Sequence, residues 1–165
     1  MNPRQFVYRV FYALPHRTRH RIVRLFTPTY IIGAVVLVRS LDERKLLLLR
    51  QPSSAGWSLP GGLLNRHEHP IHGAARELRE ETGIVVPLTA MEPMTPNAVV
   101  HHQGGWVDMV FTTRVALTTP LRTDPAEVVE AKWFDVDEIP RLSKATERLI
   151  GEYGLGPQAH NHRAS

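Results

Sequence analysis

Three glutamates in one short stretch have the residue type and the spacing for metal chemistry. Glu77, Glu80 and Glu81 are spaced i, i+3, i+4, so on an α-helix they share one face. Like charges at this spacing cost about 0.5 kcal/mol in total, and no lysine is interleaved on that face. A divalent cation reverses this cost, because clustered carboxylate oxygens suit Mg²⁺ or Mn²⁺, which then engage phosphates. The spacing therefore predicts a cation site for a phosphorylated substrate.

The segment that carries these glutamates has the end signals of a helix over residues 70–82. Pro70 suits the first helical position, and Gly83 suits a left-handed C-terminal cap. Gly61 and Gly62 come shortly before and allow the backbone to approach a metal or a phosphate closely. A second face of the helix, about a third of a turn away, is apolar and is expected to pack on a sheet. Its members are Ile71, Ala74, Ala75 and Leu78.

The rest of the chain alternates between predicted strands and turns, which indicates an α/β protein. A helix is expected at 142–151, and a Gly104–Gly105 turn joins two of the strands. A short extended piece ends in the glycines at 61–62. The predicted strands cover residues 30–39, 45–50, 84–91, 98–103, 106–116 and 128–135.

Length and composition fit one globular domain. A chain of 165 residues with 42% hydrophobic and 22% charged residues is not disordered, collagen-like or a coiled coil. The uncharged, mainly apolar run at residues 25–38 is shorter than the ~20 apolar residues of a transmembrane helix, and no secretory signal is visible. The absence of cysteine excludes disulfides and thiolate metal sites. We expect a cytoplasmic protein.

The basic residues are concentrated at the N-terminus. The first 30 residues carry six arginines and no acid, whereas the remainder carries 14 Lys and Arg against 16 Asp and Glu. Two amphipathic helices, at 4–13 and 16–26, are predicted there on either side of Pro15. This extension packs on the body or on a second copy in a homodimer, docks on an anionic membrane surface, or contacts nucleic acid. The sequence leaves all three interpretations open.

The stretch from Gly62 to Ile84 resembles the Nudix box, G-x5-E-x7-R-E-U-x-E-E-x-G-U, where U is a bulky aliphatic residue. Nine positions are specified at fixed spacing and all nine match, which makes the signal very specific. The resemblance extends more loosely over residues 29–152. The matching residues are Gly62, Glu68, Arg76, Glu77, Leu78, Glu80, Glu81, Gly83 and Ile84.

The resemblance implies a fold and a reaction. The fold is an α/β/α sandwich with a mixed sheet, here over residues 29–152. Outside it, the residue pattern predicts an N-terminal helical extension at 1–28 and a flexible tail at 153–165. The reaction is pyrophosphate-bond hydrolysis, with Mg²⁺ or Mn²⁺, in a nucleoside diphosphate linked to a second moiety. Small-molecule nucleotides are the implied substrates: nucleoside triphosphates, including oxidised ones, or ADP-ribose-like nucleotide sugars.

The resemblance also implies roles for individual residues. Glu77, Glu80 and Glu81 match the metal-binding and water-activating carboxylates, and Glu77 or Glu80 is our choice for the general base. Glu127 resembles an acidic ligand that many members bring from a later loop. Three residues have orienting or structural roles: Glu68 pairs with Arg76, and Gly62 opens the box. The Gly61 carbonyl is a further ligand in some members.

One local departure from the family pattern concerns histidines. His67 and His69 flank the first box glutamate, where many members have Gly and a capping Ser or Thr. This departure puts the helix cap in doubt, and His69 either caps weakly or stays in solvent. With His72 these residues suggest a histidine metal site, but the carboxylates already explain the metal.

Residues outside the box must decide the substrate, and the sequence does not identify them. Aromatic candidates for stacking on a base are more consistent with core positions: Trp57, Trp106, Tyr30 and Phe111. Polar candidates are Asn97, His101, His102 and Gln103. Two rival functions stay open, namely a non-catalytic nucleotide-binding regulator and an RNA 5′-pyrophosphohydrolase. The intact glutamates disfavour the regulator, and only the basic extension supports the RNA enzyme.

Overall fold

A computed structural model describes residues 2–52, 54–101, 105–157 and 159. The chain divides into two compact units, residues 1–30 and residues 31–165. None of the helices in the described part of the chain has the length and apolar character to cross a membrane.

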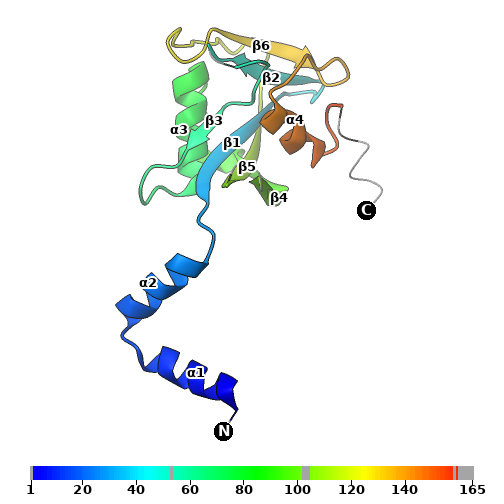
Figure 1. Cartoon of the computed structure of the whole chain (residues 1–165). Helices are drawn as coiled ribbons and strands as arrows, with labels where there is room; N and C mark the ends of the chain where they lie inside the picture. The colour runs from blue at the N-terminus through cyan, green and yellow to red at the C-terminus, as the bar shows by residue number, and fades with distance from the viewer. Residues whose placement is uncertain (1, 53, 102–104, 158, 160–165) are drawn as a thin grey trace. The chain divides into compact units, whose positions relative to one another are not determined.

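The second unit is built on one mixed sheet with the order β4-β5-β1-β2-β6 (Figure 1). Strand β1 runs parallel to β5 in register from Ile31 beside Trp106 to Ser40 beside Val115, and the other pairings are antiparallel. The short β3 pairs with residues 33–35 of β1, along the same edge as β2 but nearer the start of β1. The strands are β1 (Ile31–Ser40), β2 (Lys45–Arg50), β3 (Gly61–Leu63), β4 (Glu92–His101), β5 (Trp106–Val115) and β6 (Glu130–Asp135).

Two helices cover opposite faces of this sheet and give the predicted α/β/α sandwich (Figure 1). Because side chains alternate along a strand, β1 serves both layers. Val36 joins the buried cluster with Leu78 of α3 (Pro70–Thr82). Leu37 joins a second cluster with Ile150 of α4 (Lys144–Gly151). The sheet is therefore buried on both faces, which fixes α3 against one of them.

The ends of α3 follow the predicted signals in part. Pro70 lies at the first helical position, and Gly83 adopts the left-handed conformation at φ 72°. The Gly83 N–H donates to the carbonyl of Arg79 at 2.9 Å, which closes the last turn. His69 occupies the N-cap position but its side chain makes no capping hydrogen bond.

Two sequence predictions about this unit need correction. The strand predicted at 84–91 is wrong: the segment leaves the helix, and a single 3₁₀ turn at Leu88–Ala90 follows Pro87. Pairing with β5 begins only after this turn, at residue 92. The first residue of the predicted tail is packed rather than loose, because the Tyr153 hydroxyl donates to the Pro96 carbonyl at 2.7 Å. Gly104 and the tail residues 158 and 160–165 lie outside the described residues.

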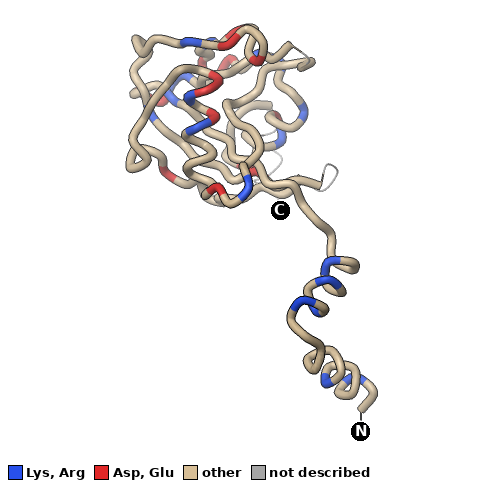
Figure 2. The backbone as a smooth tube through the Cα atoms, turned by 90° about the vertical axis from the view of Figure 1, so that its left-hand side faces the viewer, with Lys and Arg blue, Asp and Glu red and all other residues tan. Residues whose placement is uncertain are grey.

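The first unit contains the two predicted helices, α1 (Pro3–Ala13) and α2 (His16–Phe26). Asn2 caps α1 by accepting from the Arg4 N–H, and Pro15 stands between the helices. Figure 2 shows basic but no acidic residues on this unit, in contrast to the mixed charges of α3.

Candidate active site

Glu81 is a buried carboxylate where α3 lies against β3. The residue as a whole is only 4% exposed. It accepts hydrogen bonds from the Gly61 N–H at 2.8 Å and from the Gln51 amide at 3.2 Å. The pKa of Glu81 is raised to about 7, chiefly by burial; the charges of Glu77 and Glu127 add to this rise, and the two hydrogen bonds oppose it. The protein thus holds a carboxylate whose negative charge is incompletely compensated.

Arg76 connects the other carboxylates of the helix. Its Nε and Nη2 each donate to Glu68 at 2.9 Å, which is the predicted pair. Its Nη1 donates to Glu77 at 2.7 Å and to Glu80 at 3.1 Å, and Nη2 also donates to the Leu63 carbonyl. The Arg76 guanidinium holds the pKa of Glu68 at about 2. Arg76 therefore fixes these carboxylates relative to β3.

Gly62 makes room for Glu77. A Cβ atom on Gly62 would lie 2.5 Å from both the carboxyl carbon and Oε1 of Glu77. Such distances are well below van der Waals contact, so no other residue fits at this position while Glu77 stays where it is. The close backbone approach predicted for this glycine is therefore an approach to a carboxylate.

Glu127 reaches the same electrostatic neighbourhood from far along the chain. It lies in the turn before β6, where its N–H donates to the Asp124 carbonyl at 3.0 Å. The residue is exposed, yet its charge raises the pKa of Glu81. The fold thus brings Glu127 toward the glutamates of α3, while its role as a ligand stays a prediction.

The carboxylates fit a divalent cation by chemistry rather than by a preformed cage. Within the described ranges, no three His, Asp or Glu side chains are grouped as a metal site. That includes His67, His69 and His72, so the structure gives the histidine alternative no support. In the structure, Arg76 holds the Glu77 carboxylate and the Gly61 N–H holds the Glu81 carboxylate. Glu81 suits a divalent cation, because burial disfavours the negative charge of its carboxylate and a bound cation would stabilise that charge.

Sequence reasoning missed polar residues next to the site. Gln51 had no signal, since only the fold brings it to Glu81. Asp108 of β5 lies beside β1, with Oδ1 2.7 Å from where a Cβ of Gly33 would be. Its Oδ2 is 2.9 Å from Nε2 of His101, which is only 2% exposed. The pairing depends on the β4–β5 register, which no local pattern in the sequence reveals.

Most of the residues predicted as candidates for substrate binding pack against, or form hydrogen bonds with, other parts of the protein. Phe111 is in the core, and Trp57 packs edge-on against Phe134 with ring centroids 4.7 Å apart. Asn97 donates to the Val110 carbonyl at 2.7 Å. Of the remaining candidates, Trp106 packs on His101, Tyr30 is exposed, and His102 and Gln103 lie outside the described residues.

Comparison with known proteins identifies a family. A model of the NUDIX domain matches residues 29–152. A MutT-like protein of Streptomyces ambofaciens is 32% identical in an alignment of 132 residues that covers 78% of this chain and 80% of that protein. An ADP-ribose pyrophosphatase of Methanocaldococcus jannaschii is 26% identical, over 67% of this chain and 66% of its own.

A solved structure agrees with the sequence comparisons. The crystal structure of a MutT NUDIX hydrolase from Burkholderia pseudomallei superimposes with a TM-score of 0.60 at 26% identity. The match covers 75% of this chain and 97% of the other. It therefore spans nearly the whole of that protein, with the arrangement of sheet and helices described above.

Proposed function

The chain belongs to the Nudix family and is a pyrophosphohydrolase by that membership, and we propose that it hydrolyses a nucleoside diphosphate derivative at the α3 carboxylates. The observation that carries the proposal is the junction of β3 and α3. There the Gly61 N–H binds Glu81, and Gly62 leaves room for Glu77. Arg76 donates hydrogen bonds to Glu77 and to the other carboxylates around it. This is a built acidic site rather than a solvated helix face.

We propose that Glu77, Glu80 and Glu81 hold Mg²⁺ or Mn²⁺, with Glu127 and the Gly61 carbonyl as further ligands. When bound, such a cation neutralises phosphate oxygens and lowers the pKa of water. The buried position of Glu81, 4% exposed, excludes bulk water from one side of the cluster. The exposed Glu127 lies toward solvent, where a substrate enters. The donors are all hard oxygens, as these two ions prefer.

The same glutamates also supply the proton acceptor for the attacking water. Glu77 and Glu80 are the proposed candidates, because Arg76 holds both carboxylates and neither is as buried as Glu81. Glu80 is the more exposed of the two, at 44% of its side chain against 16% for Glu77. Arg76 positions both carboxylates and is proposed to act through them. Its bond to the Leu63 carbonyl ties that arrangement to β3.

The proposed substrate class is a nucleoside monophosphate joined by an anhydride to a second phosphorylated group. ADP-ribose is one candidate, since the Methanocaldococcus relative is an ADP-ribose pyrophosphatase. Nucleoside triphosphates, oxidised or not, are the other candidates. Hydrolysis of either kind breaks one P–O–P linkage, with the oxygen of water forming the new bond to phosphorus. The products are a nucleoside monophosphate and the second phosphate-bearing group or pyrophosphate.

A substrate panel tests the proposal. Purified full-length protein with Mg²⁺ is incubated with ADP-ribose, the common and oxidised nucleoside triphosphates, and a 5′-triphosphate RNA, and nucleoside monophosphate or pyrophosphate release is measured. We expect turnover of a nucleotide sugar or a free triphosphate. Release from the RNA alone assigns the RNA enzyme instead. Tight nucleotide binding by calorimetry without release from any substrate assigns a regulator and overturns the proposal.

A further inference from the structure

Within the first unit, the two helices leave most of their large apolar residues exposed. Helices α1 and α2 have 11 residues each, and neither contains a buried residue. An isolated helix of this length is marginal in water, and most helices in proteins are stabilised by covering an apolar face. Leu25 is 80% exposed and Phe26 is 84% exposed. These helices therefore require a further surface.

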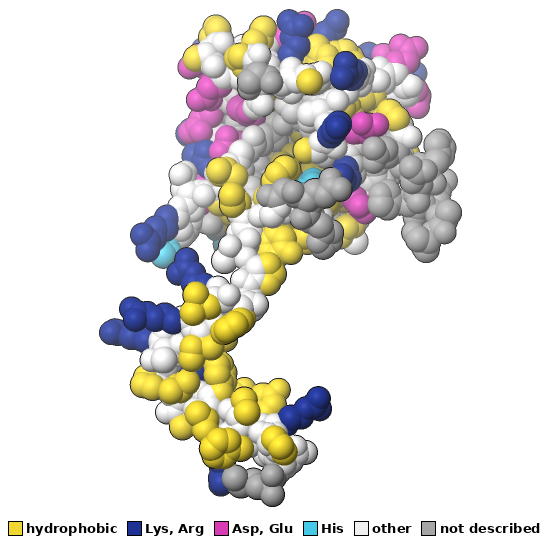
Figure 3. All heavy atoms as spheres, viewed as in Figure 1, with side chains coloured by type: hydrophobic (Ala, Val, Ile, Leu, Met, Phe, Trp, Pro, Cys, Tyr) yellow, Lys and Arg dark blue, Asp and Glu magenta, His cyan; other side chains and the backbone are white. Residues whose placement is uncertain are grey.

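Basic and apolar residues are separated on α2. Arg17, Arg21 and Arg24 follow the spacing i, i+4, i+7 and lie on one side of the helix. Ile22 and Phe26 share another side. Figure 3 shows hydrophobic side chains gathered over both helices of this unit, with Lys and Arg side chains at their margins. This is the pattern of a helix that lies in an interface between water and an apolar phase.

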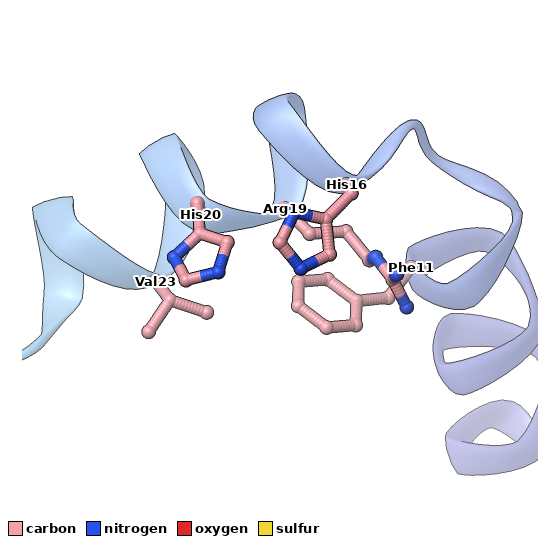
Figure 4. Close-up of a pocket in the computed structure, with 5 residues that line it drawn as sticks. All are labelled: Phe11, His16, Arg19, His20 and Val23. Atoms are coloured by element: carbon pink, nitrogen blue, oxygen red, sulfur yellow. The ribbon is translucent and has the colours of Figure 1, made fainter.

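Arg19 is the exception, because it lies on the apolar side of α2. Its guanidinium lies over the Tyr12 ring, 5.5 Å from the centroid. Arg19 lines a pocket between the two helices together with Phe11, His16, His20 and Val23 (Figure 4). Figure 4 shows the Phe11 ring, the two imidazoles and Val23 pointing into this pocket. A pocket that combines the cationic Arg19 with the apolar Phe11 and Val23 suits a ligand with an anionic head and an apolar body.

Charge selects among the possible occupants. Residues 1–30 carry six arginines and no acid, so two copies of this unit repel each other. Contact with nucleic acid uses the arginines but leaves Leu25 and Phe26 in water. We propose that this unit docks the protein on an anionic phospholipid surface, with its apolar side in the interface and its arginines on the headgroups. This proposal does not depend on the hydrolytic activity.

Vesicle flotation of the full-length protein tests this docking. One set of vesicles contains only phosphatidylcholine, and the other contains equal parts of phosphatidylcholine and phosphatidylglycerol. We expect binding to the anionic set alone, with a gain of helical circular dichroism. Each arginine near such a surface contributes about fivefold in affinity, so the triple variant R17E/R21E/R24E is expected to bind at least on the order of 100-fold more weakly.

Two further variants separate the contributions. L25S/F26S removes apolar residues without changing the charge and is expected to weaken binding to the anionic vesicles. K132E/R141E/K144E makes the same charge change at exposed residues of the second unit and is expected to bind like the parent. Thermal unfolding of each variant checks that the second unit stays folded.

Four outcomes would overturn the proposal. The first is equal binding to neutral and anionic vesicles, and the second is unchanged binding by R17E/R21E/R24E. The third is binding of a labelled duplex DNA, lost in that variant, without binding to vesicles. The fourth is a dimer in light scattering that L25S/F26S dissociates, again without vesicle binding, which assigns the surface to a second copy.

Discussion

Replacement of Gly62 by alanine is expected to damage the reaction and spare the fold. The new Cβ would lie 2.5 to 2.6 Å from the carboxyl atoms of Glu77, whereas ordinary contacts begin at 3.4 Å. The carboxylate must therefore move by nearly 1 Å, away from its 2.7 Å hydrogen bond with Arg76. A misplacement of about 1 Å in a catalytic site costs on the order of 100-fold in rate.

The same substitution has a small effect on the free energy of unfolding. Only the far end of a flexible side chain has to move, and alanine restricts the unfolded chain, so the change is expected to stay within about 1 kcal/mol. The assay compares kcat/KM with Mg²⁺ and the thermal unfolding midpoint of G62A and the parent. The matched control is G154A, because Gly154 has a φ of 72° and open space around it. We expect G154A to lose stability and keep its rate. A folded G62A within about threefold of the parental rate would refute the reasoning.

The late carboxylate and the orienting pair give two further predictions. E127Q is expected to raise the Mg²⁺ concentration needed for half-maximal rate, while E130Q, whose partner is Arg50 at 3.4 Å, leaves it unchanged; identical titration curves would remove Glu127 from the site. Arg76 holds the pKa of Glu68 at about 2, below the ordinary 4.5, so folding disfavours its protonation. Its stabilising contribution is complete above about pH 4.5 and is lost as the pH falls toward 2. The urea midpoint of E68Q should therefore fall less than the parental midpoint between about pH 5 and pH 3, and parallel declines would contradict this.

The sequence predicted those parts of the molecule that local signals determine. The bounds of α3 followed from Pro70 and Gly83, and the two N-terminal helices followed from their periodicity and Pro15. The pattern at 84–91 was misread, because the apolar residues there form a partly buried connection after the helix rather than a paired strand, with Ile84 in the core and Val85 exposed. Pairing with a neighbour is a property of the fold, which a local pattern does not contain.

The site divides in the same way. The face shared by Glu77, Glu80 and Glu81 follows from helical spacing, and the Glu68–Arg76 pair followed from the family pattern. The bond from Gln51 to Glu81 joins residues 30 positions apart, and the contact of Asp108 with β1 depends on the parallel register of β1 and β5. These partners come from long-range packing, so no residue spacing indicates them.

The most direct test of the metal-dependent mechanism measures nucleoside monophosphate release by the parent and by E80Q, with Mg²⁺ and with EDTA. The substitution keeps the side-chain shape and removes the charge of a residue whose side chain is 44% exposed, so the fold is expected to persist. We expect that EDTA abolishes turnover by the parent, that excess Mg²⁺ restores it, and that E80Q is slower by orders of magnitude. Turnover that survives EDTA, or a folded E80Q at the parental rate, would contradict the account.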